Sequence, residues 1–315
     1  MSTQCHTFRT GTVLAIFAAV MALAPLRAGA AEPIRFAIQA WPGVTVKTEV
    51  ATRLLEAMGY ETTIQSLEPQ FVYQGISTGD VDVSLGAWMP AHKDMLQPFI
   101  DEGSAVQYAV NLDGAIQGLA VPTYAYRAGV QTVEDLVEQG AKFERTIYAI
   151  GAGAAMTRAF QDAVEEDYMG LGDWTVTPSS VAGMLSQVRR ATKNDEFVVF
   201  HGWKPHWMDI RFDISFLEAD PEGRLAGQDS TVYTIVAEGW PDRNPQVAKF
   251  LRQFKVPADA QSRWIDGYSR QEREVGDVAV DWIGENMDLV SQWVEGVKTV
   301  DGGSGIEAVR AQFGG

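Results

Sequence analysis

Three tryptophans stand beside prolines at points where strand-like apolar segments end. These sites read Trp41-Pro42, Trp88-Met89-Pro90 and Trp203-Lys204-Pro205. An indole has a negative π face, and several indoles arranged as a box attract a cation, each face contributing about 0.5–2 kcal/mol once water is excluded. The spacing therefore predicts a box for a quaternary ammonium group, whose charge and methyl groups an indole accommodates together.

The alternative role for such a tryptophan is packing in the core, because aromatic side chains dominate interior contacts. Three equivalent positions, each beside a proline, favour a shared ligand site over three separate core contacts. By contrast, Trp264, Trp282 and Trp293 lie on helical apolar stripes and are assigned to the core. Trp174 and Trp240 precede turns, and the sequence leaves their role open.

Two histidines flank the third tryptophan of the box. His201 and His206 are five residues apart, but Pro205 disrupts a helical ligand pair and no cysteine follows Cys5, so we expect no metal site. His206 either donates a hydrogen bond to a ligand carboxylate or serves as a structural histidine. Neither G-x-S-x-G nor H-E-x-x-H is found, so we also expect no catalytic residues and no cofactor.

A glycine-containing turn, Gly151-Ala152-Gly153, follows an apolar strand and opens a predicted helix, as a dinucleotide-binding loop would. The third glycine position of that fingerprint is Met156, which makes the match weak. The segment instead favours a tight turn whose backbone N–H groups face a cleft at a helix N-terminus.

The elements that position these residues alternate between period-2 and period-3.6 apolar patterns. This alternation is typical of strand–helix–strand units and a largely parallel sheet. We expect strands over 34–41, 62–67, 81–88, 146–151, 174–179 and 197–203, and helices over 47–59, 155–168 and 181–193. The first helix carries the stripe Val46, Val50, Leu54 and Met58, with Gly59 at its C-terminal cap.

The repeated order of elements indicates two α/β domains joined by a hinge. Residues 31–115 and 232–315 are expected to form a discontinuous domain I, and residues 116–231 domain II. Segments 115–126 and 230–240 would cross between the domains, which returns the C-terminal helices to domain I. Ligands of open α/β sheets bind beyond the carboxyl ends of the strands. Domain closure would therefore bring the three tryptophans together around a small molecule.

The start of the chain has the pattern of a secretory signal over residues 1–30, with Arg9, an apolar run and the cleavage site Ala28-Gly29-Ala30. An uncleaved anchor is disfavoured, because the run has about fourteen residues and a membrane span needs roughly twenty. Without Arg9 and Arg27, 23 basic and 41 acidic residues give a net charge near −18. This charge disfavours nucleic acid and anionic membranes as partners. We expect a periplasmic protein.

Nearly the whole mature chain resembles the periplasmic substrate-binding proteins of ABC importers for quaternary amines, the glycine betaine and choline-binding family. The resemblance is carried by TRLLEAMGY (52–60), GAWMP (86–90), GWKPHWM (202–208) and KTVDGGSGIEAVRAQF (298–313). It implies a two-domain periplasmic binding protein fold (type II) that closes about a hinge and delivers ligand to an ABC permease in the inner membrane. A non-enzymatic monomer is expected, because a closing receptor needs free domains.

The resemblance also extends to the box. Trp41, Trp88 and Trp203 match box positions of the choline-binding branch, whereas Gln117 stands where that branch has a box tyrosine. The loss of one aromatic wall leaves room for a differently shaped head group.

Two further departures concern the polar end of the ligand. Gly43 replaces the aspartate after the first tryptophan, and Ala154 replaces an asparagine of the second-domain turn. These two side chains hold the hydroxyl of choline in that branch. The glycine betaine branch instead binds a carboxylate with main-chain N–H groups, at the position of Gly43 and Val44, and a helix N-terminus suits an anion. A betaine-type zwitterion is therefore favoured over choline.

Several alternatives stay open at this level. Choline, carnitine, trimethylamine N-oxide or a sulfonium analogue would use the same box. A secreted enzyme acting on methylated amines would need a nucleophile, a metal or an acid–base pair in the cleft. A sensor component that presents ligand to a membrane receptor is not distinguished from a transport protein by the sequence.

Overall fold

The structure, a computed structural model, describes residues 1–3 and 32–314. Residues from Glu32 onward form one compact unit. The signal segment expected over residues 1–30 lies, apart from its first three residues, outside the described part of the chain. Within that part, no helix is both long and apolar enough to cross a bilayer.

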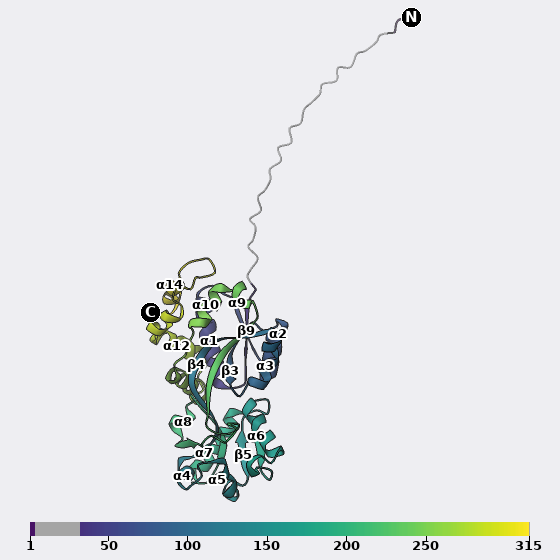
Figure 1. Cartoon of the computed structure of the whole chain (residues 1–315). Helices are drawn as coiled ribbons and strands as arrows, with labels where there is room; N and C mark the ends of the chain where they lie inside the picture. The colour runs from purple at the N-terminus through teal and green to yellow at the C-terminus, as the bar shows by residue number, and fades with distance from the viewer. Residues whose placement is uncertain (4–31, 315) are drawn as a thin grey trace. The chain divides into compact units, whose positions relative to one another are not determined.

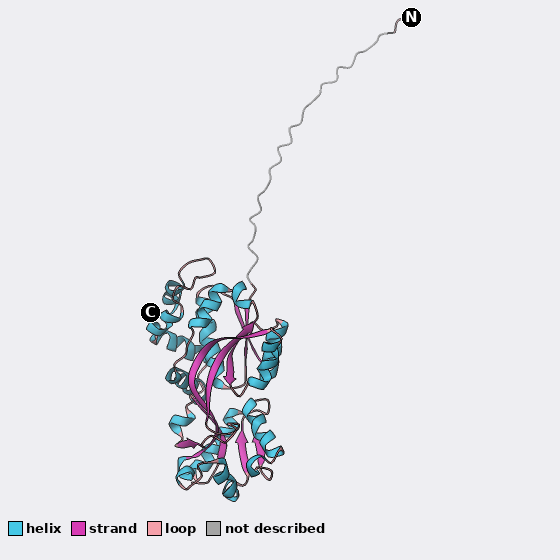
Figure 2. Cartoon of the chain, viewed as in Figure 1, coloured by secondary structure: helices cyan, strands magenta, loops and turns pink. Residues whose placement is uncertain are grey.

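A single mixed sheet of nine strands organises the described residues (Figure 2). The strand order is β2-β1-β3-β9-β4-β7-β5-β6, and β8 pairs with β4. The strands are β1 (Ile34–Ile38), β2 (Thr62–Ser66), β3 (Val83–Met89), β4 (Ala105–Pro122), β5 (Thr146–Ala149), β6 (Thr175–Pro178), β7 (Val199–Lys204), β8 (Ile214–Phe216) and β9 (Gln228–Ala237). All six strands expected from the period-2 pattern are present.

Parallel pairing is confined to the two ends of the sheet. β1 is parallel to β2 and β3, and β5 is parallel to β6 and β7. In the middle, β9 and β4 are antiparallel to each other and to β3 and β7 respectively. The expectation of a largely parallel sheet is therefore wrong for the middle. The middle is antiparallel because the two segments that cross between the ends of the sheet, β4 and β9, run in opposite directions and pair with each other.

We call β1, β2 and β3 with their helices the β1 side, and β5, β6 and β7 with theirs the β5 side (Figure 1). The β1 side carries α1 (Pro42–Ala57), α2 (Pro69–Thr78), α3 (Lys93–Asp101), α9 (Trp240–Arg243), α10 (Pro245–Gln253), α11 (Ala258–Ile265), the π-helical turn η3 (Asp266–Arg270), α12 (Val275–Glu285), α13 (Met287–Trp293) and α14 (Gly305–Phe313). The β5 side carries α4 (Thr123–Arg127), α5 (Val133–Glu138), η1 (Gly140–Phe143), α6 (Ala155–Glu165), η2 (Tyr168–Gly170), α7 (Val181–Lys193) and α8 (Met208–Arg211).

Helix α1 shows how local sequence places Trp41, the first of the three tryptophans beside prolines. Trp41 is its N-cap in an extended conformation, and Pro42 opens the helix, where a fixed φ is favourable and a missing N–H costs nothing. The expected stripe of Val46, Val50, Leu54 and Met58 is buried in the core of the β1 side. Gly59 follows the C-cap with φ +85°, a left-handed conformation that glycine adopts without strain.

The tryptophans assigned to the core are buried there. Trp264 meets Trp282 edge-on at a centroid distance of 4.8 Å, and Trp282 stacks on Trp293 at 5.6 Å. The C-terminal helices therefore return to the β1 side, as predicted. Trp174 and Trp240, whose role the sequence left open, are buried in the cores of the β5 and β1 sides respectively.

The long strands β4 and β9 connect the two sides (Figure 1). Their ladder runs from Ala105 opposite Ala237 to Gln117 opposite Gln228. Its register shifts three times, between Gln107 and Ala109, between Val110 and Leu112, and between Leu112 and Ala115. Gly114 lies in this irregular stretch with φ +69°. The connection is thus a paired two-stranded ribbon with an irregular middle.

Candidate functional site

A small cavity lies between the β1 side and the β5 side. It is lined by Trp41, Trp88, His92, Gln117, Ile150, Ala154, Ala155, Met156, His201 and Trp203. The three tryptophans singled out by their position beside prolines thus meet at one place. The space between the protein atoms at this place, including its opening to solvent, is about 360 Å³.

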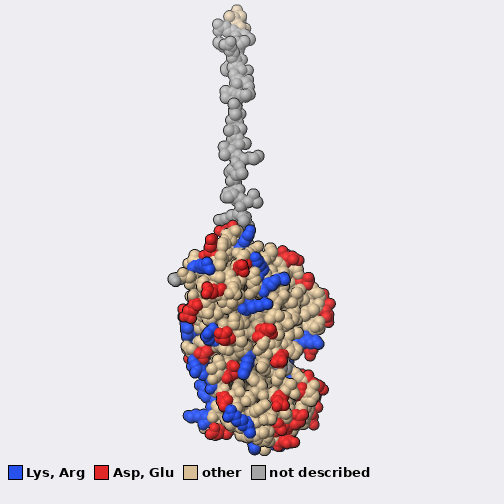
Figure 3. All heavy atoms as spheres, turned by 60° about the vertical axis from the view of Figure 1, so that its left-hand side comes forward, with Lys and Arg blue, Asp and Glu red and all other residues tan. Residues whose placement is uncertain are grey.

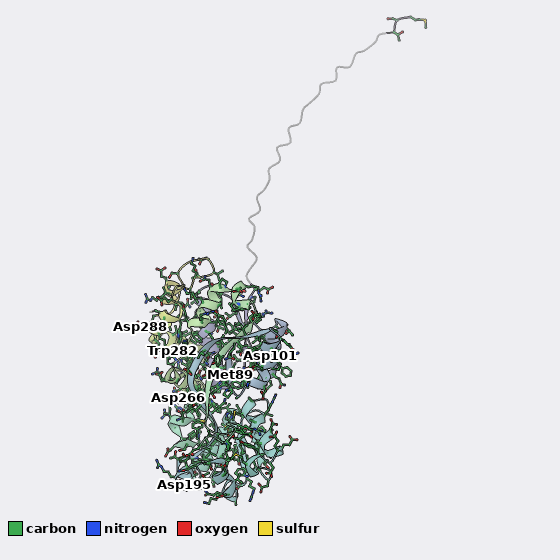
Figure 4. The ribbon with its side chains drawn as sticks, in the orientation of Figure 1. Met89, Asp101, Asp195, Asp266, Trp282 and Asp288 are labelled. Atoms are coloured by element: carbon green, nitrogen blue, oxygen red, sulfur yellow. The ribbon has the colours of Figure 1, made fainter. Side chains whose placement is uncertain are left out.

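Strand ends position two of the tryptophans. Trp88 and Trp203 are buried near the ends of β3 and β7, and each of these strands stops at the residue before a proline. Figure 4 labels Met89, which follows Trp88. Trp41 differs from the expectation, because β1 ends three residues earlier and this half-buried indole stands at the start of α1.

Gln117 reaches the cavity from the central strand β4. It lies opposite Trp203 in the antiparallel ladder, two residues before Leu119, which lies opposite His201. Because alternate residues of a strand share a face, Trp203 and His201 project to the same side of the sheet. The Gln117 Nε2 donates to Ser230 Oγ at 3.3 Å, which orients its amide.

His92 is a cavity residue that the sequence analysis missed. Its Nδ1 is 2.6 Å from the Tyr73 hydroxyl, and its ring meets Trp41 edge-on at 5.9 Å. Burial lowers the pKa of His92 to about 4, so the imidazole is neutral at neutral pH. A usable signal was the repeat of a histidine shortly after each Trp-x-Pro, His92 in one case and His206 in the other.

His201 lies beneath the third tryptophan with no hydrogen-bond partner among the described residues at either ring nitrogen. His201 is only 4% exposed. The centroid of its ring lies 5.1 Å from that of Trp203 and 5.7 Å from that of Phe160. Burial lowers the pKa of His201 to about 3. From the sequence, the only functional role weighed for His201 was that of a metal ligand.

His206 does not line the cavity. Its Nδ1 accepts the Met208 backbone N–H at 3.0 Å, and its ring packs between Trp203 and Trp207 at 4.9 and 5.2 Å. Burial lowers the pKa of His206 to about 3. These contacts fit the structural role, and a ligand contact from this residue stays a prediction.

Gly43 and Val44 also lie outside the cavity lining. Both are buried in the first turn of α1, and a Cβ on Gly43 would lie 3.0 Å from Gln261 Nε2, pointing toward α11. A side chain at position 43 would therefore meet Gln261 and Ile265 of α11. The anion site expected at this helix N-terminus remains a prediction.

The N-terminus of α6 does reach the cavity. The Ala154 N–H donates to the Gly151 carbonyl at 2.9 Å, which closes the tight turn predicted for this segment. Ala154, Ala155 and Met156 then line the cavity as the helix begins. The small side chains of Ala154 and Ala155 leave the backbone of the first helical turn close to the cavity.

The cavity is electrically neutral, although the molecular surface is highly charged. Among the described residues that line it, none is Asp, Glu, Lys or Arg. On the surface, by contrast, basic and acidic side chains are interspersed (Figure 3). The described residues also contain no group of three His, Cys, Asp or Glu side chains placed to hold a metal. A bound cation would therefore face indoles and neutral imidazoles.

Comparison with known proteins gives consistent matches over most of the chain. A family model for the substrate-binding domain of ABC-type glycine betaine transport systems matches residues 32–285. A solved ABC-transporter choline-binding protein in complex with choline is 31% identical, with a TM-score of 0.84 over 90% of this chain and 98% of that chain. Lactococcal OpuAC, closed on glycine betaine, is 27% identical, with a TM-score of 0.74 over 83% and 98%.

Two curated proteins are also similar to this chain in sequence. The glycine betaine/carnitine transport binding protein GbuC of Listeria monocytogenes is 34% identical over 167 residues, which is 52% of this chain and 53% of GbuC. An uncharacterised protein of Chromohalobacter salexigens is 42% identical over 136 residues, 42% of this chain and 88% of that protein.

Proposed function

Because the chain belongs to the family of substrate-binding domains of ABC-type glycine betaine transport systems, we propose that it captures a methylated amine of the glycine betaine type and delivers it to an ABC permease. Its role as a substrate-binding protein of a glycine betaine and choline transporter follows from the family match and the structural neighbours. The predicted fold, the two-domain type II periplasmic binding protein fold, is likewise confirmed by those neighbours.

The observation that carries the proposal is the neutral cavity with three indoles. The cavity receives Trp41 and Trp88 from the β1 side and Trp203 from the β5 side. A trimethylammonium group between them would meet several π faces. A carboxylate in place of an indole would have to be desolvated, which costs free energy. The lining thus suits a cation without N–H groups better than a primary amine, which needs hydrogen-bond acceptors.

For the ligand itself we propose a zwitterion rather than choline. Gly43 and Ala154 offer no side-chain group for a hydroxyl. The similarity to a glycine betaine/carnitine transport binding protein supports the same class. Choline, carnitine and trimethylamine N-oxide are the alternatives, with the same role for the protein.

We further propose that closure occurs about the irregular stretch of the β4–β9 ribbon. Domain I would comprise residues 31–115 and 232–315, and domain II residues 116–231. The register shift between Leu112 and Ala115 supports a hinge near these boundaries, because a broken ladder bends more easily than a regular one. We propose a periplasmic, non-enzymatic monomer that binds no nucleic acid.

Calorimetric titration tests the function directly. The purified chain is titrated with glycine betaine, choline, carnitine, proline betaine and trimethylamine N-oxide, with proline as a control that lacks N-methyl groups. We expect tight binding of one methylated amine and no heat with proline. Absence of binding to every methylated amine would overturn the proposal, and product formation from a bound ligand would replace it with the enzyme alternative.

A further inference from the structure

A lysine is buried within the β1 side. Lys47 of α1 is only 2% exposed, and its Nζ donates to Asn111 Oδ1 at 2.6 Å and to the Leu85 carbonyl at 3.5 Å. Both acceptors are uncharged, and transfer of an ammonium group from water into a protein core costs free energy. An apolar side chain of similar length would fill the same space without this cost. Lys47 therefore has a role beyond packing.

The residue that Lys47 contacts is a bulge in the ribbon of β4 and β9. Asn111 stands between two residues of β4 that lie opposite successive residues of β9, so it is an extra residue in the ladder. A bulge bends its strand and increases the local twist. β4 and β9 are the long curved strands that join the two sides (Figure 2). Asn111 thus marks a point at which this connection bends.

Asn111 is held in place from several directions. Its Nδ2 donates to the Leu85 carbonyl of β3 and to Thr234 Oγ1 of β9, each at 3.2 Å. Its own carbonyl accepts the N–H of Val256, which precedes α11, at 2.8 Å. Among the described residues, only Lys47 donates to Asn111 Oδ1. The lysine therefore completes the set of contacts that holds the bulge.

The same contacts connect the bulge to the elements that carry two of the tryptophans. Lys47 lies on the helix that begins directly after Trp41. Leu85 lies on β3, three residues before Trp88. Lys47 and Asn111 thus join α1 and β3 to the start of the connection between the two sides.

Resting on the proposed function and on closure about this ribbon, we propose that Lys47 stabilises the bulge at Asn111 and thereby sets the rate at which the two sides open to release the ligand. A hydrogen bond from an ionised donor is roughly twice as strong as one between neutral groups. A protonated Lys47 therefore holds the bulge more firmly than a neutral one. Loss of this proton loosens the bulge and speeds opening.

Lys47 changes its charge near neutral pH, whereas the buried histidines near the cavity do not. Burial lowers the pKa of Lys47 to about 7. Burial also lowers the pKa of His92 to about 4 and of His201 and His206 to about 3, so these imidazoles are uncharged above pH 6. The other partners of Asn111 are a threonine and backbone groups, so Lys47 is the titratable group that contacts the bulge.

The charged residues on neighbouring elements have other surroundings. β3 carries no charged residue, and Asp113, the only one on β4, is exposed. On α12 and α14, the charged residues outside ion pairs are exposed, namely Asp277, Glu285, Glu307 and Arg310. The ion pairs on α1 and on the other elements packed against it are Arg35–Asp82, Glu49–Arg53, Arg53–Glu56, Asp259–Arg263, Asp266–Arg270 and Arg273–Asp281.

The pH profile of ligand release distinguishes this role from a merely structural one. Release of glycine betaine is followed by stopped-flow tryptophan fluorescence at pH 6 and pH 8.5 in the wild-type chain, Lys47→Met and Asn111→Ala. Methionine has a similar length but carries neither a donor nor a proton. Lys193→Met, which removes the same charge from an exposed position of α7, is the matched control. Thermal unfolding shows which variants fold, so that either substitution at the bulge can carry the test.

We expect release from the wild-type chain and from Lys193→Met to be about threefold faster at pH 8.5 than at pH 6, because the charged hydrogen bond is lost. Lys47→Met should release ligand about threefold faster than wild type already at pH 6, with no further change at pH 8.5. Asn111→Ala should behave in the same way. A flat profile in the wild-type chain, or a wild-type profile in Lys47→Met, would overturn the proposal.

Amide hydrogen exchange tests the same contact without ligand. At pH 6 the exchange over residues 105–115 should be faster in Lys47→Met than in the wild-type chain, while exchange in β5 stays unchanged. Equal exchange over 105–115 would overturn the role of Lys47 and leave the proposed function intact. If the wild-type chain binds no methylated amine, the proposed function fails, and hydrogen exchange still decides whether Lys47 stabilises the bulge.

Discussion

The cavity has one wall on the β1 side and one on the β5 side, and each wall has a histidine beside a tryptophan. The two walls differ in how these histidines are hydrogen-bonded. On the β1 side, His92 beside Trp41 has its Nδ1 bonded to the Tyr73 hydroxyl, a contact made within the protein. On the β5 side, His201 beside Trp203 has no such partner. Among the described residues, the histidine of the first wall is paired within the protein and the histidine of the second wall is not, while the buried indole Nε1 of Trp41 in the first wall is also unpaired. Both walls contribute tryptophans to the proposed box, so the walls differ in how their histidines are paired and not in whether they would contact an ammonium group.

The largest expected effect comes from removing an indole. Trp88→Ala and Trp203→Ala should each weaken binding of glycine betaine by more than tenfold, about 2–3 kcal/mol, because a desolvated cation–π face and its packing are lost. Calorimetric titration measures this loss. Trp174→Phe, in the core of the β5 side and outside the cavity, is the matched control.

These two substitutions also test both walls, because Trp88 belongs to the β1 side and Trp203 to the β5 side. Tetramethylammonium should lose affinity as strongly as glycine betaine in both variants, since the box holds only the ammonium. Wild-type affinity in Trp88→Ala and Trp203→Ala together would remove the tryptophans from the site and leave them as core residues.

The next effect concerns the paired histidine on the β1 side, His92. Burial raises the pKa of Tyr73, so its hydroxyl stays protonated and forms a hydrogen bond with His92 Nδ1. Tyr73→Phe leaves a buried nitrogen unpaired and should lower the free energy of unfolding by about 1–3 kcal/mol. Urea unfolding monitors the stability, and titration should show glycine betaine affinity within about threefold of wild type. A loss of affinity as large as that of Trp88→Ala would contradict a purely supporting role.

The sequence predicts some parts of this site and not others. Trp88 and Trp203 were found because strand periodicity and a following proline are local signals. The antiparallel pairing of β4 with β9 was not predicted, since it depends on residues more than a hundred positions apart. The same limit applies to His201: its open nitrogens are defined by what surrounds them in space. The direction of a Cβ at Gly43, toward Gln261, also needed the folded chain.

The histidines of both walls predict a loss of stability in acid. Burial lowers the pKa of His92 to about 4 and of His201 and His206 to about 3, all below the ordinary value of 6.5. As pH falls below 6.5, the unfolded chain takes up protons that the folded chain does not, so stability present above that pH is lost. Each histidine contributes about 1 kcal/mol of this loss between pH 6.5 and 5.5.

Urea unfolding at several pH values measures that slope. His206→Phe should flatten it by the share of one histidine, because phenylalanine binds no proton in either state. An unchanged slope in this variant would mean that His206 titrates in the folded protein as it does in the unfolded chain.

The smallest effect is expected where the two walls touch outside the cavity. Arg158 of α6 donates to Gln70 Oε1 of α2 and lies 3.9 Å from Met95 Sδ of α3, so it links the β5 side to the β1 side. Partly exposed polar contacts contribute less than about 1 kcal/mol, so Arg158→Ala should speed ligand release by about threefold. Stopped-flow tryptophan fluorescence with glycine betaine measures the rate. Arg190→Ala is the control, because Arg190 pairs with Glu196 within the β5 side. Equal release rates in both variants would mean that the contact of Arg158 with Gln70 and Met95 does not help to hold the two walls together.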